Sequence, residues 1–98
     1  MSGFVLAIDQ GTSNTKAIAL DAKARIAASH SVPTPVRYPR PGWVEQSGDE
    51  IWEATRAAIL GCVAGLPDGV KIAAVAIANQ RESVLLWRRS TGETVAPA

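Results

Sequence analysis

The sequence predicts a small α/β domain with three strands, one helix, and then a strand to which a further strand is appended. Two continuous apolar runs, residues 4–8 and 72–78, are typical of strands buried on both faces. Between them, apolar residues over 51–63 recur at helical spacing. A chain of 98 residues has room for one domain of this kind or for part of a larger one.

The first three strands are expected to form an antiparallel meander, because short polar turns separate them. The expected strands and turns, in chain order, are 4–8, the turn 10–14, 15–20, the turn 21–24, and 25–31.

A loop and one helix are expected next. Four prolines exclude a helix from residues 32–46, which we expect to form an extended surface loop. Ser47 and Glu50 have the spacing of a capping box, and Gly65 is expected to end the helix that they begin. Residues 83–87 are expected to form the appended strand.

Composition and charge exclude several classes of protein. The formal net charge is +1 and the longest basic run is Arg88-Arg89, so no dense basic face for nucleic acid is predicted. No apolar stretch approaches the ~18–20 residues that span a membrane, and no basic segment of the kind found in signal peptides precedes the first apolar run. Cys62 is the single cysteine, so no internal disulfide is expected. These features favour a cytoplasmic protein without nucleic-acid or membrane partners.

The first candidate site runs from Asp9 to Asn14. A buried strand brings the Asp9 carboxylate to its end, and the turn offers backbone N–H groups with the hydroxyls of Thr12 and Ser13. Gly11 permits the close approach of an anion, and Mg²⁺ prefers oxygen ligands such as a carboxylate. The spacing matches neither a Walker A loop nor a dinucleotide-binding fingerprint. The alternative is a plain hairpin capped by Asp9.

The second candidate site is Asn79-Gln80-Arg81-Glu82, at the end of the second apolar run, where open α/β sheets bind ligands. Arg81 can donate hydrogen bonds to a vicinal diol and Glu82 can accept them. The alternative is a surface ion pair at a strand end. Lys16, two residues past the first turn, either reaches a phosphate or points to solvent.

Several other residues are interpreted as structural. Trp43 either stacks on a sugar or anchors the proline-rich loop to the body, and we favour anchoring. Trp52 and Trp87 lie on apolar patterns and are expected to pack. Cys62 is expected to be an inert residue on the helix face, and His30 has no nucleophile or metal partner nearby in the sequence.

Three segments, taken in order, resemble the FGGY carbohydrate kinases of the actin/Hsp70/hexokinase superfamily. They are residues 7–16, similar to the first phosphate motif of the family; 41–46 with 50–52; and 78–83 with Trp87 and Thr91-Gly92. Together they span nearly the whole chain. The run 79–82 resembles the members that phosphorylate glycerol. Ser83 stands where those members usually have threonine, and 13–16 is equally similar to members that act on xylulose or gluconate.

The resemblance implies a ribonuclease H-like fold with a mixed sheet, the first three strands antiparallel, the post-helix strand alongside them, and the helix covering one face. It also implies roles for single residues. Asp9 would organise Mg²⁺ through water, and Arg81 with Glu82 would bind substrate hydroxyls. The residues that would face the ATP phosphates are Gly11, Thr12, Ser13, Asn14 and Lys16.

By this resemblance, the protein transfers the γ-phosphoryl group of Mg-ATP to a hydroxyl of glycerol or a related small sugar or polyol. Residues 1–98 are expected to be the N-terminal portion of the first domain, because 94–98 is typical of an extended segment cut short. The catalytic base aspartate and the second, nucleotide-binding domain are expected beyond Ala98, so the fragment alone is expected to be inactive. The alternatives are another FGGY sugar kinase (for xylulose, gluconate or similar), a non-catalytic sugar-sensing member, and an actin-like assembly protein. Whether the full-length protein is a homo-oligomer stays open.

Overall fold

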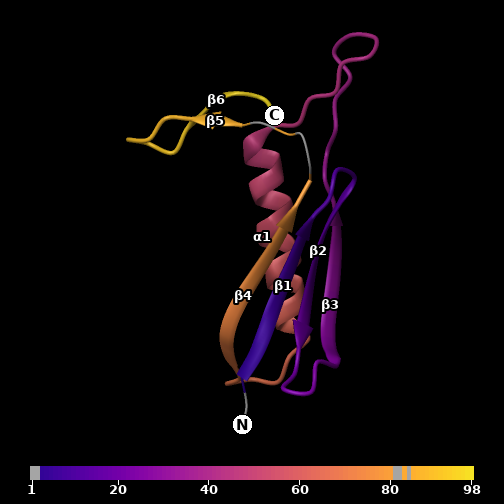
Figure 1. Ribbon diagram of the computed structural model, residues 1–98, viewed down its shortest axis with the longest axis vertical. Helices are drawn as coiled ribbons and strands as arrows, with labels where there is room; N and C mark the ends of the chain where they lie inside the picture. The colour runs from indigo at the N-terminus through magenta and orange to yellow at the C-terminus, as the bar shows by residue number, and fades with distance from the viewer. Residues whose placement is uncertain (1–2, 81–82, 84) are drawn as a thin grey trace.

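The structure is a computed structural model that describes residues 3–80, 83 and 85–98. Its main sheet has the strand order β3-β2-β1-β4 (Figure 1). The pairs β1–β2 and β2–β3 are antiparallel and the pair β1–β4 is parallel, so the sheet is mixed, as expected. The strands are β1 (Gly3–Gln10), β2 (Asn14–Leu20), β3 (Ile26–Pro33) and β4 (Lys71–Asn79).

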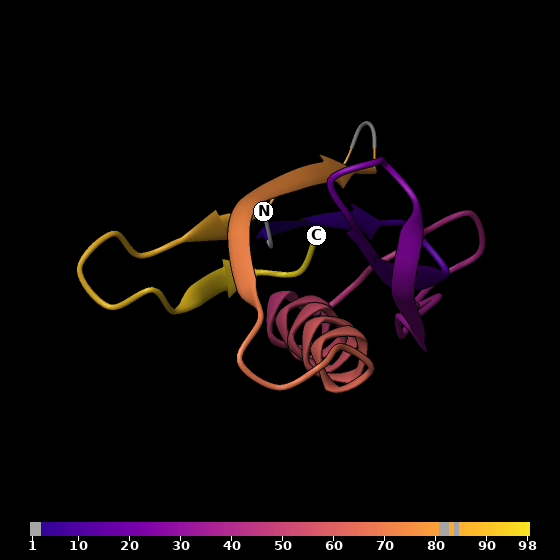
Figure 2. The same cartoon turned by 90° about the horizontal axis from the view of Figure 1, so that it is seen from below.

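One helix, α1 (Gly48–Ala64), covers one face of this sheet (Figure 2). It begins where the sequence predicts, because the Ser47 hydroxyl accepts a hydrogen bond from the Glu50 N–H at 3.4 Å. It ends at Gly65, whose N–H donates to the Cys62 carbonyl at 3.1 Å. Among the described residues, no helix is long and apolar enough to cross a membrane.

Small side chains bring the helix close to the sheet. Ala17 and Ala19 on β2, with Ala58 and Cys62 on α1, are fully buried at 0% exposure. The opening that Gly61 leaves is filled by His30 of β3, since a Cβ at Gly61 would lie 2.3 Å from the imidazole Cδ2. The core therefore lies between α1 and the β3–β2–β1 part of the sheet.

The location of the core corrects the predictions of burial. Residues 4–8 and 72–78 do form strands, but neither is buried on both faces, since Val5, Val75 and Ile77 are 36%, 55% and 67% exposed. The tryptophans at 52 and 87, predicted to pack, are 58% and 62% exposed. The strand β4 is exposed because α1 lies over β2 and β3 and leaves β4 as an outer strand that it does not cover.

The appended strand does not join the main sheet. Instead β5 (Leu86–Trp87) pairs with β6 (Thr94–Ala96) in a separate antiparallel ribbon. This ribbon lies against the start of α1, where a Cβ at Gly48 would meet the Thr94 Cγ2 atom at 2.5 Å. Within the predicted strand 83–87, the structure describes Leu86–Trp87 as strand, and this strand lies in the separate ribbon.

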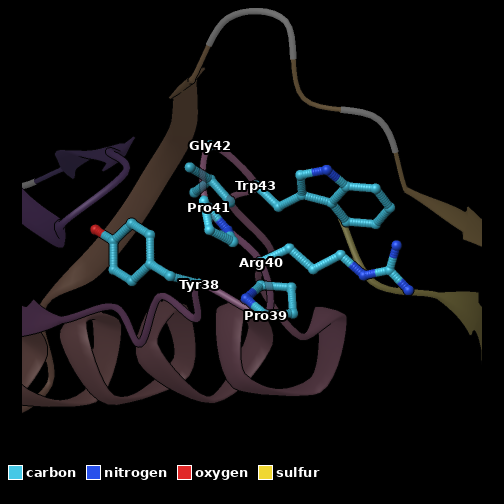
Figure 3. A pocket seen from close by; sticks show the side chains of 7 residues that line it. Tyr38, Pro39, Arg40, Pro41, Gly42 and Trp43 are labelled. Atoms are coloured by element: carbon cyan, nitrogen blue, oxygen red, sulfur yellow. The ribbon is translucent and has the colours of Figure 1, made fainter.

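Arg37 is one of the residues that join the proline-rich loop to the body. Its guanidinium pairs with the Glu50 carboxylate at the start of α1, and this hydrogen bond lowers the pKa of Glu50 and raises the pKa of Arg37. Trp43 does not anchor the loop, because its indole is 51% exposed. The Arg40 guanidinium lies over the Trp43 ring, 4.9 Å from its centroid, while Tyr38 points the other way (Figure 3).

The single cysteine offers a check on the core. Burial raises the pKa of the Cys62 thiol, and the sulfur, which is inaccessible to solvent, donates toward the Ala28 carbonyl. We expect alkylation of the tryptic peptide 57–71 to be negligible in the native protein near pH 8 and complete in denaturant, because only an exposed thiolate reacts. Equal labelling in both states, measured by mass spectrometry, would show that this part of the core is wrongly assigned.

Candidate functional site

The two candidate segments lie at the same edge of the sheet. Because β1 and β4 run parallel with Gln10 opposite Asn79, the turn after β1 and the segment after β4 leave the sheet at the same end (Figure 1). Beside them is a hollow of about 210 Å³. It is lined by Gln10, Ile51, Asn79, Gln80, Ser83, Leu85 and Ala98. The shared edge is the geometry that the two sequence segments predict.

The turn after β1 is closed tightly over Gly11. The Gly11 N–H donates to the Asn14 carbonyl at 2.9 Å, and a Cβ at Gly11 would lie 2.7 Å from that same oxygen. Only glycine fits this backbone without a shift. At the tip, Thr12 and Ser13 are exposed, and within the described part of the chain their backbone N–H groups have no protein partner. Two neighbouring N–H donors of this kind suit a phosphate oxygen.

Gly11→Ala is expected to destabilise the protein by about 1–3 kcal/mol, because the added methyl collides with a backbone carbonyl that is held in the turn. Thermal unfolding measures this change. The matched control is Gly42→Ala in the proline-rich loop, where φ is +80° and nothing lies within 4 Å of the new Cβ, so only backbone strain is added. We expect the Gly11 variant alone to lose affinity for ATP, and equal nucleotide binding by both variants would contradict this role of the turn.

Asp9 and Lys16 face the same side of the sheet. They are register partners on β1 and β2, and both are exposed, whereas the neighbouring Ile8 is buried in the core cluster. Alternation along β1 therefore places both side chains on the face away from α1. One carries a hard oxygen ligand and the other a positive charge, next to the turn that Gly11 closes.

These residues fit a magnesium–nucleotide group. Among the described residues, no three His, Cys, Asp or Glu side chains gather into a metal cage. Mg²⁺ does not need one, because it usually binds through one or two carboxylates, water and substrate phosphates. Asp9 supplies such a carboxylate at the end of β1, within the same strand–turn–strand unit as the exposed N–H groups.

Hydrogen bonds that the sequence interpretation missed hold the turn and its flanking residues against the rest of the protein. The Thr34 N–H donates to the Ser13 carbonyl at 2.8 Å. The hydroxyls of Thr15 and Thr34 share a hydrogen bond of 2.8 Å in the interior, at 0% and 5% exposure. On the other side, the Gln10 amide donates to the Thr55 hydroxyl of α1 at 2.8 Å. The only sequence signal for these contacts is the polar character of the residues, which does not reveal their partners.

A closed ring of hydrogen bonds joins the turn to the end of β4. The Thr12 hydroxyl donates to Gln80 Oε1 at 2.9 Å, and Gln80 Nε2 donates to Gln46 Oε1 at 2.8 Å. Gln46 Nε2 in turn donates to the Thr12 carbonyl at 2.8 Å, which closes the ring. The Thr12 hydroxyl proton is therefore already engaged. The turn donors that this leaves for a ligand include the two exposed N–H groups, the Ser13 hydroxyl and the side-chain amide of the exposed Asn14.

Arg81 and Glu82, the predicted substrate-binding residues, lie outside the described residues. Their neighbours in sequence, Gln80 and Ser83, both line the hollow at the shared edge. Their roles therefore stay predictions.

The matching family model is described as the FGGY family of carbohydrate kinases, N-terminal domain, and it covers residues 4–98. An apulose kinase of Pectobacterium atrosepticum is 46% identical over 93 residues, which are 95% of this chain and 18% of that protein. A glycerol kinase of Rhizobium rhizogenes is 42% identical over 96 residues, 97% of this chain and 19% of that protein. The chain thus spans about a fifth of the length of these relatives.

Solved structures agree on the fold. A crystal structure of Plasmodium falciparum glycerol kinase with ADP matches with a TM-score of 0.88 at 28% identity, covering 98% of this chain and 20% of that one. A ligand-bound xylulose kinase from Lactobacillus acidophilus matches with a TM-score of 0.86 at 23% identity, over 97% of this chain and 19% of that one. The fold is thus the ribonuclease H-like fold of the actin, Hsp70 and hexokinase type. Within that class, the chain belongs to the FGGY family of carbohydrate kinases.

Proposed function

We propose that this chain is the first part of an ATP-dependent kinase that phosphorylates a hydroxyl of glycerol or a related sugar or polyol. The observation that carries the proposal is the shared edge. The Gly11–Asn14 turn and the segment after Asn79 leave parallel neighbouring strands at the same end of the sheet, in register. Phosphoryl transfer requires the phosphate donor and the acceptor hydroxyl to lie in line at short range, and two binding segments at one edge of the sheet suit that requirement.

Each predicted residue has a role in this scheme. The exposed N–H groups of the turn, with Ser13, Asn14 and Lys16, hold the phosphates of ATP. Asp9 orients the water shell of Mg²⁺, which when bound offsets the charge of the transferring phosphoryl group. The catalytic base aspartate is expected beyond Ala98.

Arg81 and Glu82 are proposed to hold adjacent hydroxyls of the acceptor. The guanidinium donates hydrogen bonds and the carboxylate accepts them, so the pair suits a vicinal diol. The hollow that Gln80 and Ser83 line lies beside this segment. A small polyol or sugar is an acceptor of matching chemistry.

The substrate within this class is tested with an acceptor panel. Glycerol is our first choice because of the Asn-Gln-Arg-Glu run and the relative named glycerol kinase. Apulose is the second, because the relative named apulose kinase is 46% identical. Xylulose and gluconate complete the panel, since structures of kinases with those names share the fold.

The experiment measures acceptor-dependent formation of ADP by the full-length protein with each compound. We expect glycerol to be turned over with the highest kcat/KM and residues 1–98 alone to be inactive. Turnover of another acceptor in its place would overturn the choice of glycerol. If an acceptor binds but none stimulates ADP formation, the protein is instead a non-catalytic sugar-sensing member, and its sequence beyond Ala98 would lack the base aspartate.

A further inference from the structure

Gln46 is a buried polar residue whose hydrogen-bonding groups are all satisfied. It is 4% exposed and directly precedes Ser47, the residue that caps α1. Its backbone N–H and carbonyl pair with Ala98 at 3.0 and 2.8 Å. Its side-chain amide donates to the Thr12 carbonyl and accepts from Gln80, each at 2.8 Å. This one side chain thus connects two segments that are far apart in the sequence.

The Thr12–Gln46–Gln80 ring requires an amide at position 46. The Gln46 side chain acts as a donor at one end and an acceptor at the other, and a carboxamide does both at once. A glutamate keeps the acceptor for Gln80 but places an oxygen opposite the Thr12 carbonyl. A methionine of similar shape does neither, and leaves the Thr12 carbonyl and the Gln80 amide without partners.

The ring spans the shared edge of the site. Thr12 is at the tip of the turn that we propose binds ATP phosphates, and Gln80 directly precedes the proposed substrate residues Arg81 and Glu82. We propose that Gln46 is a positioning residue. It holds the phosphate turn, residues 11–14, at a fixed separation from the acceptor segment, which begins at the end of β4 with Asn79 and Gln80. The catalytic consequence of this inference rests on the proposed function. The hydrogen-bonded connection between the two segments rests only on the contacts described above.

A positioning role has its own kinetic signature. If the turn moves relative to the acceptor segment, each half still binds its own ligand, but the acceptor hydroxyl is no longer in line with the phosphoryl group. A misplacement of about 1 Å costs roughly 10²-fold in transfer. Water is small and mobile, so it still reaches the phosphoryl group. Hydrolysis of ATP should therefore persist while transfer to the acceptor falls.

The test compares wild type, Gln46→Met and Gln46→Glu in the full-length protein, with ATP and the best acceptor of the panel. Inorganic phosphate, which forms only by hydrolysis, and phosphorylated product are measured in the same reaction. We expect inorganic phosphate formed per product to rise at least about tenfold in both variants, by the misplacement argument above. Partial unfolding lowers the rates of hydrolysis and transfer in the same proportion. A purely structural defect would therefore leave this ratio unchanged. An unchanged ratio in the variants would overturn the proposal.

Cys62→Ala is the matched control. It removes a fully buried side chain from the core at the other end of α1, and it lowers stability without touching the ring. We expect a reduced melting temperature with a wild-type ratio of inorganic phosphate to product. A raised ratio in this control would show that any loss of stability uncouples transfer, and would overturn the assignment to Gln46.

Hydrogen exchange tests the connection without any activity. In Gln46→Met we expect exchange to quicken about tenfold at the Gly11 amide, which donates to the Asn14 carbonyl, and in peptides that cover 79–80, with the β2–β3 pairing unchanged. Gln46→Glu should quicken exchange at the Gly11 amide more than at 79–80, because it keeps the acceptor for Gln80, and it serves if the methionine variant does not fold. Unchanged exchange in both segments would overturn the proposal. If the wild type phosphorylates no acceptor, the proposed function fails, and exchange alone decides whether Gln46 joins the two segments.

Discussion

Replacing Asp9 by asparagine in the full-length protein is expected to lower kcat by about 10²–10³-fold, the size seen when one group that stabilises transition-state charge is removed. The Asp9 carboxylate is exposed at the end of β1, opposite Lys16 and beside the phosphate turn. The amide keeps the shape of the side chain but loses the charge that orders the water shell of Mg²⁺. We therefore also expect the variant to need a higher Mg²⁺ concentration for half-maximal rate.

Asp21→Asn is the control for this substitution. Asp21 is also a carboxylate next to β2, but it lies at the opposite end of that strand, in a turn where it pairs with Arg25 at 3.0 Å. We expect a small change in stability and a wild-type kcat. If both variants keep wild-type activity at low Mg²⁺, Asp9 does not organise the metal, and the plain-hairpin interpretation holds.

Arg81→Ala is expected to raise KM for the acceptor by about 10–100-fold, with KM for ATP nearly unchanged. Hydrogen bonds to a charged group contribute about 1.5–3 kcal/mol each, and each 1.4 kcal/mol corresponds to about tenfold in affinity. The effect falls on the acceptor because Arg81 follows β4, whereas the proposed phosphate donors follow β1. Initial rates over a grid of both substrate concentrations separate the two constants.

Arg88→Ala is the control for the arginine substitution. Arg88 follows β5 in the separate ribbon, where its backbone pairs with Glu93. We expect both Michaelis constants to stay at wild-type values in this variant. An Arg81 variant whose KM rises for ATP and not for the acceptor would contradict the proposed division between the two strand ends.

Much of the fold follows from local sequence signals. The apolar runs locate β1 and β4, and the residues at positions 47 and 50 locate the start of α1. The antiparallel order of the first three strands follows from their short turns. These features depend on residues that are close in the chain, and periodicity and capping report on such residues directly.

Burial was not predictable in the same way. An apolar run shows that a strand is suited to the interior, but it does not show which part of a sheet the helix covers. The position of α1 is set by small residues on facing elements, Ala17 and Ala19 against Ala58 and Cys62, together with the space at Gly61. Such complementarity exists only after the sheet has formed, so the exposure of β4 and of Trp52 was missed.

The candidate site was likewise predictable only in part. The strand ends that carry Asp9 and Asn79 were predictable, because residues at the ends of apolar runs can be seen in the sequence, and the structure places those ends together. The Thr12–Gln46–Gln80 ring was not predictable, since its bonds join residues 34 or 68 positions apart. A glutamine next to a helix cap gives no sign of such partners.

The most direct test of the central claim is a crystal structure of the full-length protein with Mg²⁺, a non-hydrolysable ATP analogue and the best acceptor of the panel. The expected result is that the terminal phosphate lies on the turn 11–14 with the metal beside Asp9, and that the acceptor hydroxyls lie on Arg81 and Glu82 across the same edge of the sheet. Phosphates or acceptor bound away from that edge would contradict the claim.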